Sequence, residues 1–579
     1  MSNGIFRIRL LRSLTIISLA VIFVRLFFIQ IIEHDAWVAK ANEQHTLLET
    51  ITAKRGEVYM MDGSEPVAVV LNQTVYQVII DPATTDKEQI KEALSKHAKD
   101  FISADLDEVY EIKGLRYYIV ARNVPYSNAV KIAEEGINNV WLKEGNRRVY
   151  PEGEMASSLL GFVNADGIGQ YGVEGSLNKI LSGNDGLLKT TADINKVALS
   201  IGKDNVKIPA EDGKDIVLSV DRNLEKGAEE IIAEHLNNSN ATNAAMIIMN
   251  PKTSEVVAMS SLPNYNPGDY GHVKDASIYI NQVTEVPYEP ASICKNFVFS
   301  AAINEGKMTA ESTYFNEPYV VVDGIKIWNA EQRAKINNHT LTMKEALYWS
   351  LNAGSIQALK FLGDDPDSIN ATGRERMYDY YYNKFRLGQA TGIELIEAEG
   401  FIWDPHAEIY GLDAAYANMT FGQNLGITMI QTATAFSAVV NGGYYRTPSI
   451  VKGTLENGVI TPLENRETIS EQILSSETSA TMRDMLINNR SWRYNPAGYD
   501  WGGKSGTAQV VINGAYDNEM ENLIGSYAGF VGQQGEIPDY VIMVKMWGEG
   551  EAVGSGDAMD LFESLASFVI DYYKIKPKA

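Results

Sequence analysis

One long apolar run near the N-terminus constrains this 579-residue chain more than any other feature. Residues 14–32 contain a single charged side chain, Arg25, and approach the ~20 residues that a membrane-spanning helix needs. Three arginines and no acidic residue precede the run, and acidic residues follow it directly. Because basic flanks stay on the cytoplasmic side of a membrane, we expect residues 1–12 in the cytoplasm, a transmembrane anchor at 13–32, and the bulk of the chain outside.

Two features near this run have alternative interpretations. Ala39-Lys40-Ala41 resembles a signal-peptide cleavage triplet, but it lies well beyond the apolar run, which is also long for a signal peptide. We therefore expect an uncleaved anchor. Arg25 either extends its side chain toward the outer interface or contacts a membrane partner, and the sequence leaves both open.

The length and composition exclude several classes of protein. The chain is too long for one hydrophobic core, so two or more domains are expected. A net charge of −24 argues against a nucleic-acid partner, because phosphate binding needs clustered Lys and Arg. Cys294 is the only cysteine, so no intramolecular disulfide can form. The seven histidines form no metal-binding spacing, and we expect neither a metal nor another cofactor.

The remaining chain divides by pattern into two parts. Residues 36–205 mix short helical and strand-like patches without a catalytic constellation, which favours a mixed α+β spacer or docking domain. In residues 206–579, strand-like runs gather at the two ends and a mostly helical stretch lies between them. Hairpin connections imply an antiparallel sheet, so we expect an α/β (α+β) domain whose central antiparallel sheet is flanked by helices. The individual runs are a helix at 86–99, strands at 116–122 and 215–220, a helix at 222–235, a hairpin at 244–249 and 255–259, strands at 507–512, 526–531 and 540–546, and a helix at 557–573.

Three short motifs in the second part carry the chemistry. Ser292-Ile293-Cys294-Lys295 opens an apolar run and places a hydroxyl and an amine on one helical face, as a nucleophile with a neighbouring base requires. Ser350-Leu351-Asn352 lies in a helical stretch that a capping box at 342–345 should start, just before an expected break at Ala353-Gly354. Lys504-Ser505-Gly506-Thr507 enters a strand-like run. Each motif alone is weak, but the three in this order form a strong combined signal.

The third motif also overlaps a phosphate-loop pattern. Residues 498–505 fit G-x-x-x-x-G-K-S, but a true phosphate loop follows a buried strand and opens a helix. Here no buried strand precedes the pattern and a strand follows it. We therefore interpret the match as coincidence.

These motifs resemble those of the penicillin-binding proteins, the serine D,D-transpeptidases that cross-link bacterial peptidoglycan, and the likeness extends over nearly the whole chain. Residues 288–292, 420–423 and 504–509 match family patterns around the active site, and residues 55–59, 150–151, 161–163 and 170–174 match the pedestal domain. One anchor, a pedestal at 36–205 and a transpeptidase domain at 206–579 resemble the class B layout. There is no room for the glycosyltransferase domain that a class A enzyme would carry.

The resemblance implies a role for each motif residue. Ser292 would attack the penultimate D-alanine carbonyl of a stem peptide, and a neighbouring amine would resolve the acyl-enzyme. Lys295 would act as base, although the identity of the acylation base is disputed in related enzymes. Ser350 would relay a proton and Asn352 would orient the substrate amide. Lys504 and Ser505 would bind the terminal carboxylate beside Gly506, and the N–H groups of Ser292 and Thr507 would form the oxyanion hole.

Three departures from the family pattern are visible. Ala291 replaces the usual glycine before the serine, and Cys294 lies inside the first motif, where we expect a small buried packing residue. Met60-Met61 replace the usual Asp-Arg in the pedestal motif, so the role of that pair is in doubt here. None of these departures alters a catalytic functional group.

The expected partners also follow from the resemblance. They are D-Ala-D-Ala stem peptides, β-lactams, a SEDS-family glycan polymerase and other divisome or elongasome proteins at the bacterial inner membrane. Tyr288-Glu289-Pro290 favours a division-type over an elongation-type enzyme. A penicillin-hydrolysing or carboxypeptidase relative is an alternative that the pedestal argues against. A non-catalytic penicillin-binding scaffold or sensor is a further alternative.

Overall fold

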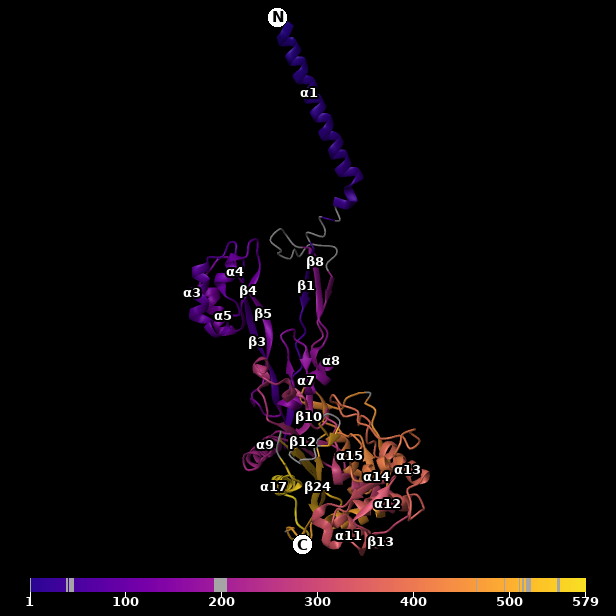
Figure 1. The fold of residues 1–579 in the computed structure, drawn as a ribbon. Coiled ribbons are helices and arrows are strands. Elements are labelled where there is room, and N and C mark those ends of the chain that lie inside the picture. Colours follow the sequence, from indigo (N-terminus) through magenta and orange to yellow (C-terminus); the bar gives the residue numbers. More distant parts are fainter. Residues whose placement is uncertain are drawn as a thin grey trace. The chain divides into compact units, whose positions relative to one another are not determined.

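The computed structural model describes residues 2–37, 40, 46–191, 206–464, 466–493, 495–509, 511–512, 515–516, 522–548 and 552–579 (Figure 1). Its chain divides into two compact units, Met1–Gly56 with Ser182–Gly213 and Glu57–Leu181 with Lys214–Ala579. The Ala39-Lys40-Ala41 triplet lies partly outside the described residues. So does the predicted domain boundary between residues 205 and 206, which stays a prediction.

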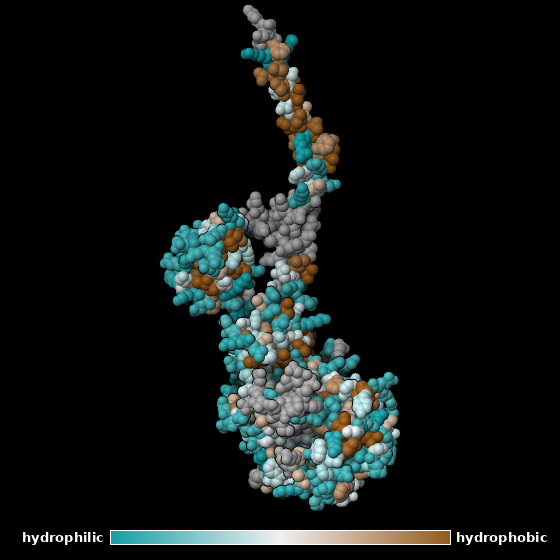
Figure 2. All heavy atoms as spheres, in the orientation of Figure 1, coloured by the Kyte–Doolittle hydropathy of each residue, from teal (hydrophilic) through white to brown (hydrophobic). Residues whose placement is uncertain are grey.

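The first unit contains the apolar N-terminal helix. α1 (Ser2–Phe27) continues into the π-helical turn η1 (Phe28–Ile32), and Phe6–Ile32 is long and apolar enough to cross a membrane. Figure 2 shows apolar residues along much of this helix, which confirms the predicted apolar span. The unit also holds an antiparallel sheet ordered β1–β8–β9, whose strands are β1 (Thr46–Ile51), β8 (Gly186–Thr191) and β9 (Val206–Ile208).

The second unit begins with a small helix-covered sheet. The predicted helix at 86–99 is α3, and Asp86 caps its N-terminus by accepting a hydrogen bond from the Gln89 backbone N–H. Apolar residues of α3, α4 and α5 pack with those of β3 and β4 in a separate core. The elements are β2 (Val58–Asp62), β3 (Glu65–Ile80), α3 (Lys87–His97), η2 (Lys99–Phe101), α4 (Leu106–Glu111), β4 (Tyr118–Pro125), α5 (Tyr126–Glu134), β5 (Val140–Val149), α6 (Ser157–Leu160), β6 (Phe162–Val163), β7 (Gly169–Gln170), α7 (Gly172–Ser176) and α8 (Asn178–Ser182).

One sheet links this region to the rest of the unit. β10 (Asp215–Asp221), the predicted strand at 215–220, pairs in parallel with β2 and antiparallel with β18 (Val451–Glu456). The strand order is β19–β18–β10–β2–β3–β4, with β19 (Val459–Thr461) at one edge and β5 paired to β3. Strands on either side of the predicted domain boundary therefore share one hydrogen-bonded sheet.

The central sheet has five strands and is antiparallel throughout. Its order is β12–β11–β25–β24–β21, so strands from both ends of the C-terminal region join, as predicted. β21 lies at one edge, which leaves one row of its backbone groups without a sheet partner. The strands are β11 (Asn243–Met249), β12 (Val256–Leu262), β21 (Tyr499–Gln509), β24 (Leu523–Gln533) and β25 (Tyr540–Trp547).

Helices cover both faces of this sheet, which confirms the predicted α/β (α+β) class (Figure 1). α9 (Arg222–Asn237) and α17 (Ser555–Tyr573) pack on one face, while α15 (Met429–Val440) and α16 (Ser476–Asn488) contact the other with α10 (Lys295–Asn304) beside them. The other elements are η3 (Pro267–His272), η4 (Ala276–Tyr279), η5 (Ala291–Cys294), β13 (Thr313–Asn316), β14 (Tyr319–Val322), β15 (Ile325–Trp328), η6 (Glu331–Ile336), β16 (His339–Thr342), α11 (Met343–Tyr348), α12 (Asn352–Leu362), α13 (Ala371–Tyr378), η7 (Asp379–Lys384), α14 (Leu412–Met419), β17 (Tyr444–Arg446), β20 (Ser470–Gln472), β22 (Val511–Ile512) and β23 (Ala515–Tyr516).

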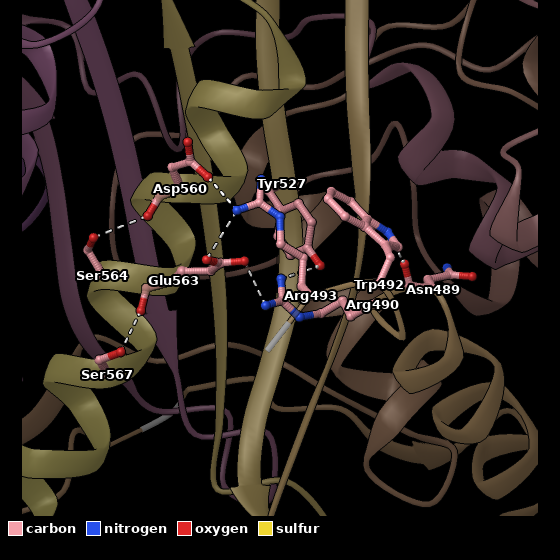
Figure 3. Close-up of polar contacts among 9 residues, drawn as sticks. All are labelled: Asn489, Arg490, Trp492, Arg493, Tyr527, Asp560, Glu563, Ser564 and Ser567. Atoms are coloured by element: carbon pink, nitrogen blue, oxygen red, sulfur yellow. Dashed lines mark hydrogen bonds and ion pairs between the residues drawn. The ribbon is translucent and has the colours of Figure 1, made fainter. Parts of the chain in front are cut away.

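A buried arginine links the central sheet to α17 (Figure 3). Arg490, which follows α16, pairs with Glu563 of α17 at 2.8 Å and lies 6.0 Å from the ring centre of Tyr527 on β24. Arg493 extends the network to Asp560 at 3.0 Å. A buried charge is tolerated when it is paired and hydrogen-bonded. The network therefore links the end of α16 to β24 and α17, next to the edge strand β21.

Candidate active site

The first motif lies where a tight turn enters a buried helix. Ser292 is in η5, and Lys295 is the first residue of α10. Ala291 has a φ of 51°, in the left-handed region that favours glycine. This conformation explains why the family pattern has glycine there, and the chain adopts it with alanine.

The Lys295 amine lies at the centre of the site and is fully buried. Its Nζ lies 3.0 Å from Ser292 Oγ and 3.3 Å from Ser350 Oγ, and it donates hydrogen bonds to the Ser350 carbonyl at 2.7 Å and to Asn352 Oδ1 at 2.9 Å. A carbonyl and an amide oxygen can only accept. If the amine is neutral, its two hydrogens point to these oxygens and its lone pair is left for a serine hydroxyl.

The second motif occupies the turn between α11 and α12. Thr342 and Glu345 form the predicted capping box at the start of α11. The predicted break at Ala353-Gly354 is wrong, because α12 already begins at Asn352 and contains both residues. A Cβ at Gly354 would lie 2.5 Å from Ala346 Cβ, so this glycine permits close helix packing instead.

Two residues that the sequence did not indicate hold Asn352 and its helix in place. Asn352 Nδ2 donates to the Trp328 carbonyl at 2.9 Å, which fixes the amide so that Oδ1 faces Lys295. Asn329 Oδ1 accepts from the Ala353 backbone N–H at 3.0 Å. Neither residue belongs to a motif, and only the fold brings 328–329 beside 352–353.

The third motif lies on the edge strand β21. Residues 498–505 enter this strand rather than a loop and a helix, so they lack phosphate-loop geometry. Lys504 is buried, Ser505 is half-buried and Thr507 is exposed. A Cβ at Gly506 would lie 2.5 Å from the Pro290 carbonyl oxygen, so glycine lets the strand approach the serine turn.

Burial and neighbouring positive charges depress the pKa values of both motif lysines. Burial is the main cause for Lys295, followed by the charges of Lys504 and Arg333, and its pKa falls well below the usual value. Burial and Arg333 lower the pKa of Lys504 to about 7. Arg333 lies in η6, with its guanidinium 5.4 Å from the Trp349 ring centre. No motif singled out this arginine, because the sequence of η6 is an ordinary polar stretch.

Gly422, within the matched segment 420–423, packs directly against the backbone of the serine turn. Its carbonyl accepts a hydrogen bond from the Ala291 backbone N–H at 3.3 Å, and a Cβ added to Gly422 would lie 2.1 Å from the Ala291 carbonyl oxygen. Its φ of 79° is left-handed as well. Glycine is therefore the residue that both the backbone and the neighbouring turn require.

We expect Gly422→Ala to slow acylation of the protein by penicillin about 100-fold, because displacing Ser292 by about 1 Å is enough to cost that factor. Gly306→Ala is the matched control: Gly306 has a φ of 65°, but nothing lies within 4 Å of an added Cβ. It should lose about 1–2 kcal/mol of stability from backbone strain alone and acylate at the normal rate. Equal acylation by both variants would contradict the steric explanation.

The other departures are accommodated by packing. Cys294 is completely buried, and burial raises the pKa of its thiol, so the reactive thiolate is disfavoured. Met60 and Met61 are buried in β2. These two side chains contribute to the core at the position where the family pattern has a charged pair.

Comparison with known proteins identifies the family of both domains. Residues 244–566 match the family "Penicillin binding protein transpeptidase domain", and residues 50–218 match "Penicillin-binding Protein dimerisation domain". Stage V sporulation protein D of Bacillus subtilis is 28% identical over 90% of this chain and 80% of that protein. Peptidoglycan D,D-transpeptidase FtsI of Buchnera aphidicola is 25% identical over 98% and 94%. The structure of penicillin-binding protein 3 from Mycobacterium tuberculosis, complexed with ampicillin, is 21% identical, covers 92% of this chain and 97% of that one, and has a TM-score of 0.65.

The fold and the three motifs thus define a serine transpeptidase of the penicillin-binding type. The chain belongs to the penicillin-binding proteins, and a dimerisation domain followed by a transpeptidase domain makes it a class B member.

Proposed function

We propose that this protein cross-links peptidoglycan stem peptides through an acyl-enzyme on Ser292, and that β-lactams acylate the same serine. The contacts of the buried Lys295 amine carry the proposal: two pure acceptors take its hydrogens, and Ser292 Oγ lies 3.0 Å away. The name of the FtsI relative and the ampicillin complex of the structural relative support the substrate and the inhibitor class.

Acylation follows from this arrangement. The lone pair of Lys295 Nζ takes the hydroxyl proton as Ser292 Oγ bonds to the carbonyl carbon of the penultimate D-alanine. The N–H groups of Ser292 and Thr507 stabilise the tetrahedral oxyanion, and one such donor is typically worth ~3 kcal/mol. The peptide C–N bond then breaks, and Ser350 passes the proton from Lys295 to the departing D-alanine amine.

Deacylation repeats these steps in reverse with a new amine. The acceptor amine attacks the Ser292 ester, loses a proton to Lys295 through Ser350, and forms the cross-link as the ester C–O bond breaks. Ser292 then regains its proton. Until the terminal D-alanine departs, Lys504 and Ser505 bind its carboxylate beside Gly506, and Asn352 orients the donor amide.

The apolar helix supports a place in the bacterial inner membrane, with the N-terminus in the cytoplasm and the catalytic domain outside. The Arg25 guanidinium lies 3.8 Å from the Glu33 carboxylate, which favours a position near the outer interface. We infer that the helix and the pedestal at 36–205 contact a SEDS-family glycan polymerase and other divisome proteins. The division assignment rests on the Tyr288-Glu289-Pro290 motif and the FtsI relative.

Depletion in the native cell, followed by muropeptide analysis, tests both the chemistry and the role. We expect the cross-linked fraction to fall and the cells to form filaments, and wild type but not Ser292→Ala should restore both. Rounded cells would instead favour an elongation-type enzyme. Full restoration by Ser292→Ala would favour a non-catalytic scaffold or sensor, and a purified protein that only hydrolyses peptides or penicillin would favour the hydrolase alternative.

A further inference from the structure

A cavity opens directly beside the serine turn and the edge strand. Its volume is about 370 Å³. Tyr288 and Glu289 on its wall lie just before the turn that carries Ser292, and Ala508 and Gln509 directly follow Thr507. A peptide whose carbonyl is placed at Ser292 therefore has this cavity next to it. The remaining lining residues are Gln282, Val286, Pro287, Leu425, Gly426, Ile524, Lys545 and Trp547.

Lys545 is the buried cation of this cavity. It lies on β25 opposite Ser526 of β24, which in turn lies opposite Gly506 of β21, so the three residues share one face of the sheet. The side chain is only 2% exposed. Its position is thus two strands away from the third motif, on the face that carries the serine turn.

The ammonium group of Lys545 is held without a carboxylate partner within the described part of the chain. Its Nζ donates a long hydrogen bond of 3.3 Å to Gln282 Oε1 and lies between two rings, 4.9 Å from the centre of Tyr288 and 4.5 Å from that of Trp547. Burial alone lowers its pKa, to about 7. A buried lysine without a counter-charge is costly to keep protonated, and the fold retains this one where a cavity adjoins the site.

We propose that this cavity receives a carboxylate carried by the acyl-donor peptide, and that Lys545 binds it. The inference rests on the proposed function and narrows its substrate class to donor peptides with a free carboxylate on the side chain that precedes the acylating D-alanine. The bound carboxylate would supply the missing counter-charge, while Tyr288 and Trp547 hold the ammonium in place through cation–π contacts.

Two penicillins that differ by one side-chain carboxylate provide the test. Benzylpenicillin and its α-carboxy derivative carbenicillin would be compared by second-order acylation rate with the full-length protein in detergent. Lys545→Met should lower the carbenicillin rate about 10-fold or more, because the charge-assisted hydrogen bond to the extra carboxylate is lost, and should leave the benzylpenicillin rate within about 2-fold. Lys360→Met is the matched control, because burial also lowers the pKa of Lys360 but this lysine does not line the cavity.

A wild-type measurement keeps the proposal testable if Lys545→Met does not fold. Donor peptides that end in D-Ala-D-Ala and carry a free side-chain carboxylate should acylate wild type about 10-fold faster than their side-chain amides. Equal rates for acid and amide, or an equal loss for both penicillins in Lys545→Met, would overturn the assignment of Lys545. Failure of the proposed function would look different, because wild type would then react with neither penicillin.

Discussion

Replacing Ser292 with alanine is expected to abolish covalent labelling of the full-length protein by fluorescent penicillin. The acyl-enzyme ester needs the Ser292 oxygen, and the Ser350 hydroxyl lies 3.3 Å from Lys295 Nζ, within reach to relay a proton. Loss of a catalytic nucleophile costs on the order of 10⁴-fold or more. Labelling followed by gel fluorescence and intact-mass measurement would show this loss directly.

Cys294 supplies the matched control for this prediction. It is the only thiol in the chain and lies two residues from Ser292, so a reactive cysteine could imitate serine labelling. Because Cys294 is fully buried and the pKa of its thiol is raised, Cys294→Ala should label at the wild-type rate. Persistent labelling of Ser292→Ala, or loss of labelling in Cys294→Ala, would refute the assignment of the nucleophile.

The parts of this site that were predictable from sequence share a physical property: their chemistry is local. Ser292 and Lys295 are three residues apart, and helical geometry alone places them on one face. The hairpin of β11 and β12 follows from two apolar runs joined by a short turn. A capping box at Thr342 and Glu345 fixes a helix start within four residues.

The parts that were not predictable depend on long-range packing. Arg333 lowers the pKa of both motif lysines although nothing in its own segment differs from a solvated loop. Lys545 looks like an ordinary strand residue until the order β25–β24–β21 places it on the face of the serine turn. The expected break at Ala353-Gly354 is wrong, because α12 contains both residues and Gly354 allows its helix to pack closely against Ala346.

Replacing Lys295 with methionine should test the proton transfer itself. The pKa of Lys295 is depressed in the fold, so in the wild type the acylation rate should rise with pH as the amine loses its proton, at a pH well below 10.5. Above about 7 the rate should fall again as Lys504 loses the charge that binds the substrate carboxylate. Lys295→Met should lower the rate about 10³-fold, within the usual range for a general base, and abolish the rising limb.

The same substitution has a stability signature that separates a catalytic from a structural loss. Between the depressed pKa of Lys295 and its unfolded value near 10.5, the unfolded chain binds one more proton than the fold, so wild-type stability rises with pH in that window. Lys295→Met has no titrating amine at this position, so its free energy of unfolding, measured with urea, should lack this part of the rise with pH. The variant should stay folded because methionine fills a similar volume. A variant that folds with this change in slope yet keeps the rising limb of the acylation profile would show that another group is the base.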